Sequence, residues 1–409
     1  MIDFIRGLLR WRTEKLVRHS SMLLGWMLLR AATQAMTVFL LTQILGVMNY
    51  GKLVSVFAIA AFFIPFVGFG LSNIVLRNGS KDPVNLQEYF RRAIYWWALT
   101  LMPIVIFSIA IFELLLPDGL PLLAAYAAIA VELGVVSLTE LCARYRQAES
   151  RIGSYGAINA GLSIIRLSFI FIFFQFSIGN IENILLIYVA SGLLYVLILK
   201  ISLKIEISIS SNFQKLMPVT SGLPLSLSAF AMRLQGEFNK PILAQTGFDL
   251  AGAYNVAQRA IDLAALPLQA IQESLWPRMY AHSDPRKIFW ISSALLCIFA
   301  ILAAFAIWLI APLLTMIFGD GFDESVAIMR QMALLPLLQS FRSLLNFKVI
   351  QREIMPLIGW SCAAGALVGV VGLAFFVPSF GVSGAVMAAY LSESVMIIWL
   401  IFGMNIHKN

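Results

Sequence analysis

The chain is a succession of long apolar runs separated by short polar turns. A membrane-spanning helix needs about 20 mostly apolar residues, and glycines, prolines and charges mark where each run ends. On this basis the 409 residues predict an all-α polytopic membrane protein with about twelve transmembrane helices. The approximate limits of these spans are 21–45, 53–76, 93–117, 121–142, 156–178, 183–203, 217–245, 251–276, 288–311, 323–345, 356–378 and 381–403.

Polar turns recur along the chain after a shift of 201 residues. The shift places the turn Gly46–Gly51 on Gly247–Gly252, and the turn 180–183 on Gly381–Gly384. Six spans separate equivalent turns, so both halves are predicted to enter the membrane from the same side, as parallel six-helix repeats. A regular ladder of helices that merely aligns with itself is the alternative. The predicted organisation is an N-terminal segment 1–20, an N-lobe 21–203, a cytoplasmic linker 204–216, a C-lobe 217–403 and a cytoplasmic tail 404–409.

Lysine and arginine are distributed unevenly over the predicted loops. Of the 29 residues, 21 fall on one side of the membrane, two on the other and six within spans. The positive-inside rule makes the rich side cytoplasmic, together with both termini. Residues 1–20 are predicted to form a basic amphipathic helix on that surface. With 60% apolar and 12% charged residues the chain does not resemble a soluble domain, and basic residues confined to short loops argue against nucleic-acid binding.

Six arginines lie within the predicted spans. A charge near the bilayer centre costs about 2.5–3.5 kcal/mol, so these side chains must face a wet interior, pair with acids or bind an anion. A guanidinium group forms two parallel hydrogen bonds with phosphate oxygens. A cationic cavity is therefore the candidate substrate site, and Arg330 and Arg342 also lie near span ends, where a long side chain can snorkel. The candidate cavity residues are Arg30, Arg166, Arg233, Arg259 and Arg342.

Acidic residues offer a competing interpretation of the same arginines. Arg30 and Arg166 have no acid nearby on their own helices, but Glu132 or Glu140 of the fourth span can pair with them. Arg233 and Arg259 have acids four and three residues further on, at helical pairing distance. Intramembrane carboxylates can also bind a coupling proton or Na⁺. The candidates for ion coupling or arginine pairing are Asp262, Glu393, Glu237 and Glu132.

The sequence shows no catalytic or metal-binding pattern. Its three cysteines, Cys142, Cys297 and Cys362, lie in or at the ends of spans without a CxxC motif. It contains no phosphate-binding glycine loop, nucleophile elbow or zinc-spaced histidine pair. We therefore predict that the protein is not an enzyme, has no catalytic residues and binds no cofactor or metal, apart from a coupling H⁺ or Na⁺.

Several segments resemble the hairpins of polysaccharide-type flippases. The first hairpin of that family carries LGxxxYG, which matches LGVMNYGKLVSVFAIAAFF (45–63), followed by GFGLSNIVLR (68–77). Spans 7 and 8 match in FNKPILAQTGFDLAGAYNVAQRAIDLAALPLQAIQESLWPRM (238–279). Spans 10 and 12 match in FGDGFDESVAIMRQMALLPLL (318–338) and FGVSGAVMAAYLSE (380–393). Together they resemble the multidrug/oligosaccharidyl-lipid/polysaccharide (MOP) exporter superfamily and, within it, the Wzx-type flippases of lipid-linked oligosaccharides.

The resemblance implies a MATE/MOP-like fold that works by alternating access. Its implied cargo is an undecaprenyl-pyrophosphate-linked glycan, of the O-antigen or exopolysaccharide kind, flipped across the bacterial inner membrane for cell-surface polysaccharide synthesis. Implied partners are this glycan, membrane lipids, and polysaccharide polymerase and glycosyltransferase machinery. Many relatives carry Arg just before the LG pair, where this chain has Gln43 and Ile44, which calls an anion contact there into question.

Two other functions stay open at this point. One is a small-molecule (drug) cation antiporter of the same superfamily, and the other is a membrane scaffold that transports nothing. No acid lies in the core of the first span, where a proton-coupled drug exporter is expected to carry one. This favours an anionic cargo over a cationic drug.

Overall fold

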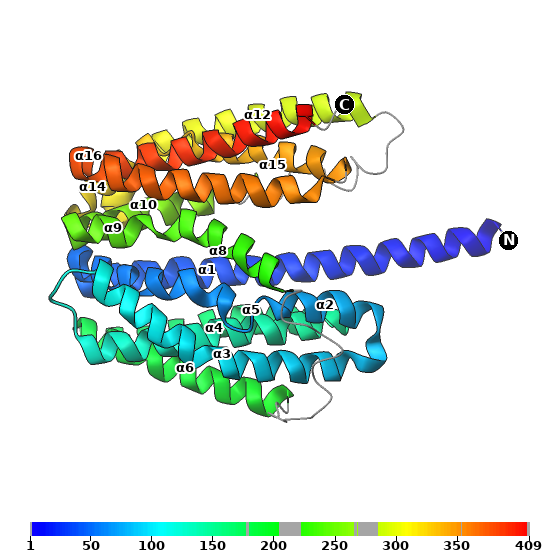
Figure 1. The fold of residues 1–409 in the computed structure, drawn as a ribbon, viewed down its shortest axis with the longest axis horizontal. Coiled ribbons are helices and arrows are strands. Elements are labelled where there is room, and N and C mark those ends of the chain that lie inside the picture. Colours follow the sequence, from blue (N-terminus) through cyan, green and yellow to red (C-terminus); the bar gives the residue numbers. More distant parts are fainter. Residues whose placement is uncertain are drawn as a thin grey trace. The chain divides into compact units, whose positions relative to one another are not determined.

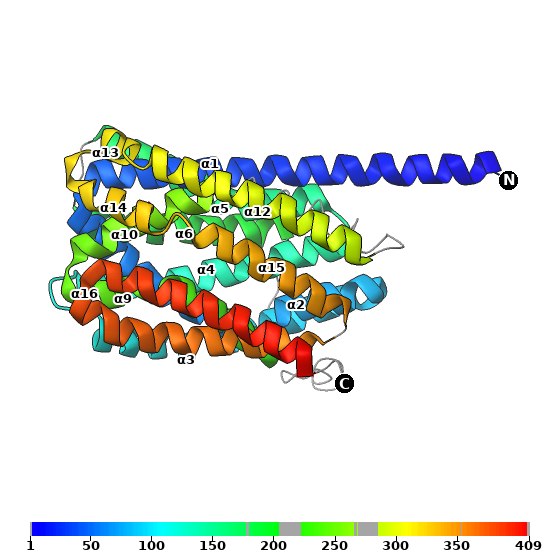
Figure 2. The same cartoon turned by 90° about the horizontal axis from the view of Figure 1, so that it is seen from above.

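The computed structural model describes residues 2–176, 180–203, 222–265, 268, 285–352 and 354–406 (Figures 1 and 2). All regular structure in these ranges is helical, which confirms the predicted all-α fold class. The helices are α1 (Ile2–Phe63), η1 (Ile64–Phe66), α2 (Leu71–Lys81), η2 (Pro83–Asn85), α3 (Leu86–Leu115), α4 (Leu122–Ala148), α5 (Ile152–Gln175), α6 (Ile181–Leu203), α8 (Leu223–Glu237), α9 (Asn239–Thr246), α10 (Phe248–Ala264), α12 (Pro285–Ile310), α13 (Leu313–Phe318), η4 (Asp320–Phe322), α14 (Asp323–Gln331), α15 (Leu335–Gln351) and α16 (Met355–Ile406).

Two glycines divide the longest helices into pairs of spans. Gly46 interrupts α1 with φ 66° and ψ 175°, and Gly381 interrupts α16 with φ 56° and ψ −130°. Glycine adopts positive φ at no steric cost because it lacks a Cβ atom. Both interruptions fall at or next to the predicted span ends. Six helical stretches of the described residues are long and apolar enough to cross a membrane. The stretch that contains Gly381 holds two predicted spans, and the stretch that contains Gly46 holds the first predicted span and the first part of the second.

Helix boundaries recur in the second half of the chain at the predicted shift. The second arm of α1 ends at Phe63, and α10 ends at Ala264, 201 residues later. Likewise α4 begins at Leu122 and α14 begins at Asp323, again 201 residues later. These two boundaries agree with the shift of the predicted internal repeat.

The second predicted span, 53–76, is two helical pieces instead of one. Between η1 and α2 the chain passes through Gly68, Phe69 and Gly70, which all have positive φ. Irregular backbone within a span leaves polar groups that other parts of the protein must satisfy. The Gly68 N–H accordingly donates to Thr100 Oγ1 of α3 at 2.8 Å. This break was not predicted, because the run remains apolar through it.

Replacing Thr100 by valine is expected to lower thermal stability, because the buried Gly68 N–H then has no acceptor. Leaving such a group unsatisfied costs about 1–3 kcal/mol. Thr100→Ser keeps the acceptor and is expected to behave like wild type. Thr139→Val is the matched control, since the equally buried Thr139 hydroxyl only donates to Val135 O at 2.6 Å. Equal melting temperatures for Thr100→Val and Thr139→Val in detergent would contradict this account.

The chain divides into two compact units. Unit 1 comprises Met1–Ile44, Phe63–Ala110 and Pro121–Leu227, and unit 2 comprises Leu45–Phe62, Ile111–Leu120 and Ser228–Asn409. The tip of the first hairpin thus belongs with the second half of the chain. The limits of the N-lobe and C-lobe stay a prediction, and the predicted linker lies outside the described residues.

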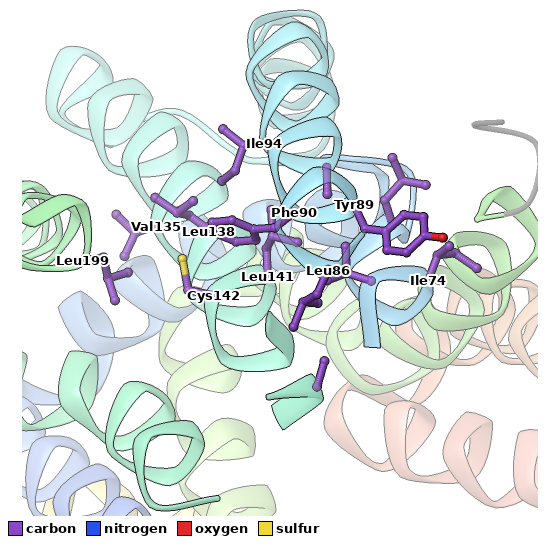
Figure 3. Packing of buried hydrophobic residues seen from close by; sticks show 14 of the residues in the cluster. Ile74, Leu86, Tyr89, Phe90, Ile94, Val135, Leu138, Leu141, Cys142 and Leu199 are labelled. Atoms are coloured by element: carbon purple, nitrogen blue, oxygen red, sulfur yellow. The ribbon is translucent and has the colours of Figure 1, made fainter. Parts of the chain in front are cut away.

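A core cluster joins α2, α3, α4 and α6 within unit 1. Figure 3 shows Phe90 of α3 beside Leu138 and Leu141 of α4, and Tyr89 of α3 beside Ile74 of α2. Its labelled members are Ile74, Leu86, Tyr89, Phe90, Ile94, Val135, Leu138, Leu141, Cys142 and Leu199. Close packing of this kind holds helices together in lipid, where no hydrophobic driving force acts between them.

The same end of α3 buries a charge that the sequence analysis counted as a loop residue. Helix α3 begins at Leu86, seven residues before the predicted span, so Arg92 is part of the helix. The Arg92 side chain is 2% exposed, and its Nε lies 3.6 Å from Glu88 Oε1. Arg92 is therefore part of the protein interior and not only a charge that sets orientation.

The N-terminal segment is helical, as predicted, but it is not a separate element. Residues 2–20 continue without a break into the first span as part of α1, beyond the ends of the other helices of unit 1 (Figures 1 and 2). A helix lying flat on a surface would need a bend before the span. Its location at the cytoplasmic surface stays a prediction.

Candidate functional site

Arg166 is held by a carboxylate and an aromatic ring within unit 1. It lies on α5, its Nη1 donates to Glu132 Oε1 of α4 at 3.2 Å, and its Nη2 bonds the other carboxylate oxygen. The guanidinium carbon lies 4.8 Å from the ring centroid of Tyr188 on α6. Glu140, the other acid considered, accepts a hydrogen bond from Ser72 at 3.4 Å. The structure thus contains the Glu132 salt bridge, one of the two alternatives for Arg166.

Arg30 is exposed on the face of α1 that packs against α5. A Cβ atom added at Gly153 would overlap Met22, and one at Gly156 would overlap Trp26. Because positions four residues apart share a helix face, Arg30 lies one turn beyond Trp26 on that face. Its side chain is exposed. Small residues on α5 therefore bring α1 close while the guanidinium stays accessible.

Four of the predicted site residues meet in one charged cluster of unit 2. Glu237, at the end of α8, lies within electrostatic reach of Arg233 and Arg259. Asp262 of α10 interacts with Arg259 as well as with Glu237. The side chains of Arg259 and Asp262 are both exposed.

A fifth charge, Lys240, completes this cluster and was not predicted. Its ammonium group forms a salt bridge with Glu237. The Lys240 side chain is only 2% exposed, which requires a charged partner in a low-dielectric interior. The three-residue spacing of Glu237 and Lys240 was the available signal. The carboxylate of Glu237 thus bonds Lys240 directly and also lies within electrostatic reach of Arg233, which is one of the two alternatives considered for that arginine.

A hydrogen bond from α10 lies beside the cluster. Helices α8 and α9 belong to one predicted span, and Phe238 between them keeps right-handed helical dihedral angles (φ −68°, ψ −21°), with its N–H donating to the Leu234 carbonyl oxygen at 3.0 Å. Gln258 of α10 donates from Nε2 to the Gly236 carbonyl oxygen at 3.1 Å, near the end of α8.

Arg342 and Glu393 form a separate pair in unit 2. The Arg342 Nε lies 2.8 Å from Glu393 Oε2, and the two side chains are 18% and 4% exposed. Gln235 Nε2 donates to Glu393 Oε1 at 3.3 Å, which links α8, α15 and α16. Arg342 therefore does not snorkel, as had been considered, but neutralises a buried acid.

The charges do not balance in the five-residue cluster of unit 2. Arg166 and Arg342 are each matched by one carboxylate. The cluster, however, combines three cations (Arg233, Lys240 and Arg259) with two carboxylates (Glu237 and Asp262). It retains one net positive charge when all five groups are ionised. Within the described residues, no group of three or more His, Cys, Asp or Glu side chains could hold a metal ion.

Known proteins match the chain in structure only. No protein-family model and no curated protein matches it in sequence. An inward-facing multidrug resistance MATE family transporter superposes with a TM-score of 0.69 at 13% identity, covering 91% of this chain and 94% of that chain. The lipid II flippase MurJ, in an inward closed conformation, gives 0.73 at 11% identity, with coverages of 95% and 87%. The chain has the fold of the MOP-superfamily transporters.

A third neighbour shows that polarity varies on this fold. A MOP superfamily transporter from Pyrococcus furiosus, described as having a binding pocket of reverse polarity, matches with a TM-score of 0.60 at 14% identity over 96% of both chains. All three neighbours are transporters and not enzymes. At such identities the likeness establishes the fold, and that fold makes this chain a polytopic membrane protein.

Proposed function

We propose that the protein is a flippase for a lipid-linked, anionic oligosaccharide. An undecaprenyl-pyrophosphate-linked glycan of the O-antigen or exopolysaccharide kind fits best, moved from the inner to the outer leaflet of the bacterial inner membrane by alternating access. The observation that carries the proposal is the net positive charge of the cluster around Glu237, within the predicted spans 217–245 and 251–276. A pyrophosphate supplies the anion that such a surplus requires.

Arg30 and Arg259 are the proposed head-group contacts. Both are exposed arginines within predicted spans, so a phosphate can reach either guanidinium. Arg166 and Arg342 were included in the predicted cavity. We assign them to holding helices together, because each already forms a salt bridge, Arg166 with Glu132 and Arg342 with Glu393. The MurJ neighbour supports lipid-linked cargo, since it is named as a lipid II flippase.

The proposal extends to coupling and partners. Asp262 is exposed beside Arg259 and is the proposed site for a coupling H⁺ or Na⁺, in reach of Lys240 and Glu237. Glu132 and Glu393 are less suited to this role, because each already bonds an arginine. Polysaccharide polymerase and glycosyltransferase machinery are the proposed protein partners.

The proposal is tested by translocation of a fluorescent polyprenyl-pyrophosphate glycan in proteoliposomes. Arg30→Gln and Arg259→Gln are each expected to slow flipping about tenfold or more, because a hydrogen bond to a charged group contributes about 1.5–3 kcal/mol. Arg330→Gln is the matched control. It is an exposed arginine of unit 2 whose guanidinium stacks 4.9 Å from the Trp308 ring, and it is expected to retain activity.

Each alternative function predicts a different outcome of this assay. A glycolipid without phosphate should be flipped poorly by wild type if the anion is recognised. Flipping that survives both substitutions would remove the proposed contacts but not the flippase. Uptake of cationic dyes without glycan flipping would indicate the antiporter, and no transport of any cargo would indicate the scaffold.

A further inference from the structure

The first predicted span contains an exposed amide that the proposed head-group contacts leave unused. Gln34 lies on α1 one turn after Arg30, and both side chains are exposed. Positions four residues apart share a face of a helix, and the rise over four residues is about 6 Å. The Gln34 amide and the Arg30 guanidinium are therefore neighbours on one side of α1, within unit 1.

The hydroxyls of the nearby threonines are bonded to their own helix. Thr33 donates from Oγ1 to the Arg30 carbonyl oxygen at 2.8 Å, and Thr37 donates from Oγ1 to the Thr33 carbonyl oxygen at 2.8 Å. Gln34 differs from them, because no other residue in the part of the chain that the structure describes bonds its amide. An amide without a hydrogen bond is costly in an apolar environment, so Gln34 needs a polar ligand or water.

The opposite side of α1 is apolar and suits contact with lipid. Leu28, Ala32 and Phe39 lie on that side, and the first two are exposed. An arginine within a span faces the protein interior or a water-filled cavity. Gln34 shares the side of Arg30, so its amide is accessible from the place where the proposed pyrophosphate binds.

The amide of Gln34 presents a donor and an acceptor next to each other. Its Nε2 donates and its Oε1 accepts, so the group can bond two hydroxyls on adjacent carbons of a sugar ring at once. Ionised phosphate oxygens only accept, and they would leave Oε1 without a donor. In a glycosyl pyrophosphate the first sugar is joined directly to the phosphate, so its hydroxyls lie about one helical turn from a phosphate bound at Arg30.

We propose that Gln34 is a specificity-determining residue, which binds adjacent hydroxyls of the sugar that is joined to the pyrophosphate. The inference rests on the proposed function, since it assigns a further group of the same cargo. Arg30 binds the anion, and Gln34 distinguishes a glycosylated carrier from a bare one. A site built to bond a hydroxyl rejects the analogue that lacks it, because the polar group of the site is then left unpaired.

Flipping of two carriers by the same proteoliposomes tests this assignment. One carrier is polyprenyl pyrophosphate with a fluorescent label on the prenyl chain, and the other has a single glucose joined to the same pyrophosphate. Gln34→Met keeps the approximate size of the side chain and removes its hydrogen bonds. It is expected to slow flipping of the glucosylated carrier about tenfold, the loss expected for two neutral hydrogen bonds, and to leave the bare carrier unchanged.

A third carrier and two variants control for size, helix and charge. Wild type should flip a carrier with O-methylated glucose about as slowly as Gln34→Met flips the glucosylated one. Gln43→Met is the matched control, because nine residues are two and a half turns and place Gln43 on the other side of α1. It should keep the wild-type ratio between the glucosylated and bare carriers. Arg30→Gln should slow both carriers and keep their ratio.

The outcomes separate the sugar contact from the flippase itself. A Gln34→Met variant that keeps the wild-type ratio between the two carriers would show that Gln34 does not bind the sugar, and the flippase would stand. Equal slowing of both carriers would assign Gln34 a structural role and also overturn the proposal. If wild type flips neither carrier, the proposed function fails and the assignment of Gln34 fails with it.

Thiol labelling tests the position of Gln34 without transport. In a background that lacks Cys142, Cys297 and Cys362, a charged thiol reagent is added on both sides of the membrane. Gln34→Cys is expected to react about tenfold faster than Ala32→Cys on the apolar side, because the reactive thiolate requires a polar environment. The glucosylated carrier should protect Gln34→Cys better than the bare carrier does. Equal labelling of the two cysteines would place Gln34 toward lipid and overturn the proposal.

Discussion

Changing Glu132 to glutamine is expected to destabilise the protein, and adding Arg166→Gln is expected to restore most of the loss. The single change leaves a guanidinium between membrane-spanning helices without its carboxylate. Breaking a buried pair from one side costs about 3–5 kcal/mol. The two side chains are 13% and 14% exposed, so about 3 kcal/mol is the expected loss. Replacing both partners by amides removes both charges and costs much less.

Thermal unfolding in detergent, followed by circular dichroism, distinguishes this pattern from simple additivity. Glu140→Gln is the matched control on the same helix, where the carboxylate only accepts a 3.4 Å hydrogen bond from Ser72, and a small effect is expected. If the double variant loses the sum of the two single losses, Arg166 and Glu132 are not a coupled pair. A stable Arg166→Gln variant that no longer flips would return Arg166 to the substrate site.

The fold could be predicted because a membrane-spanning helix leaves a strong pattern in sequence. An apolar run of the required length is visible without knowing its neighbours, and glycines such as Gly46 and Gly381 fall where the helices are interrupted. The break at 64–70 was missed because the sequence remains apolar through it. The Gly68 N–H at this break is satisfied by Thr100, 32 residues away, and no local pattern reveals that contact.

Charge pairing was harder to predict because it depends on packing between helices. Spacing along one helix offered Arg233 as a partner of Glu237, but it did not show that Glu237 also forms a salt bridge with the buried Lys240. Arg166 and Glu132 are 34 residues apart, and Arg342 and Glu393 are 51 apart, so no local spacing reveals them. The sequence identifies the arginines that lie within predicted spans. Which of these arginines form salt bridges with carboxylates follows only from the tertiary structure.

Replacing Lys240 by methionine is expected to impair both stability and flipping. Glu237 loses its direct partner, which costs about 3–5 kcal/mol for a buried pair, reduced here because Arg233 and Arg259 remain near it. The change also removes the net positive charge of the cluster, since two cations then face two carboxylates. An anionic head group should bind such a neutral cluster more weakly, and flipping is expected to fall about tenfold or more.

The double variant Lys240→Met/Glu237→Gln separates charge from the salt bridge itself. It contains neither partner, yet Arg233 and Arg259 against Asp262 again leave one net positive charge. If flipping depends on the charge surplus, the double variant should recover both stability and most of its activity. Lys52→Met, which changes a lysine bonded to the Gly119 carbonyl, is the control for losing a lysine and should keep near-normal flipping. Recovery of stability without recovery of flipping would mean that the Lys240 ammonium itself is needed, and that net charge does not explain cargo recognition.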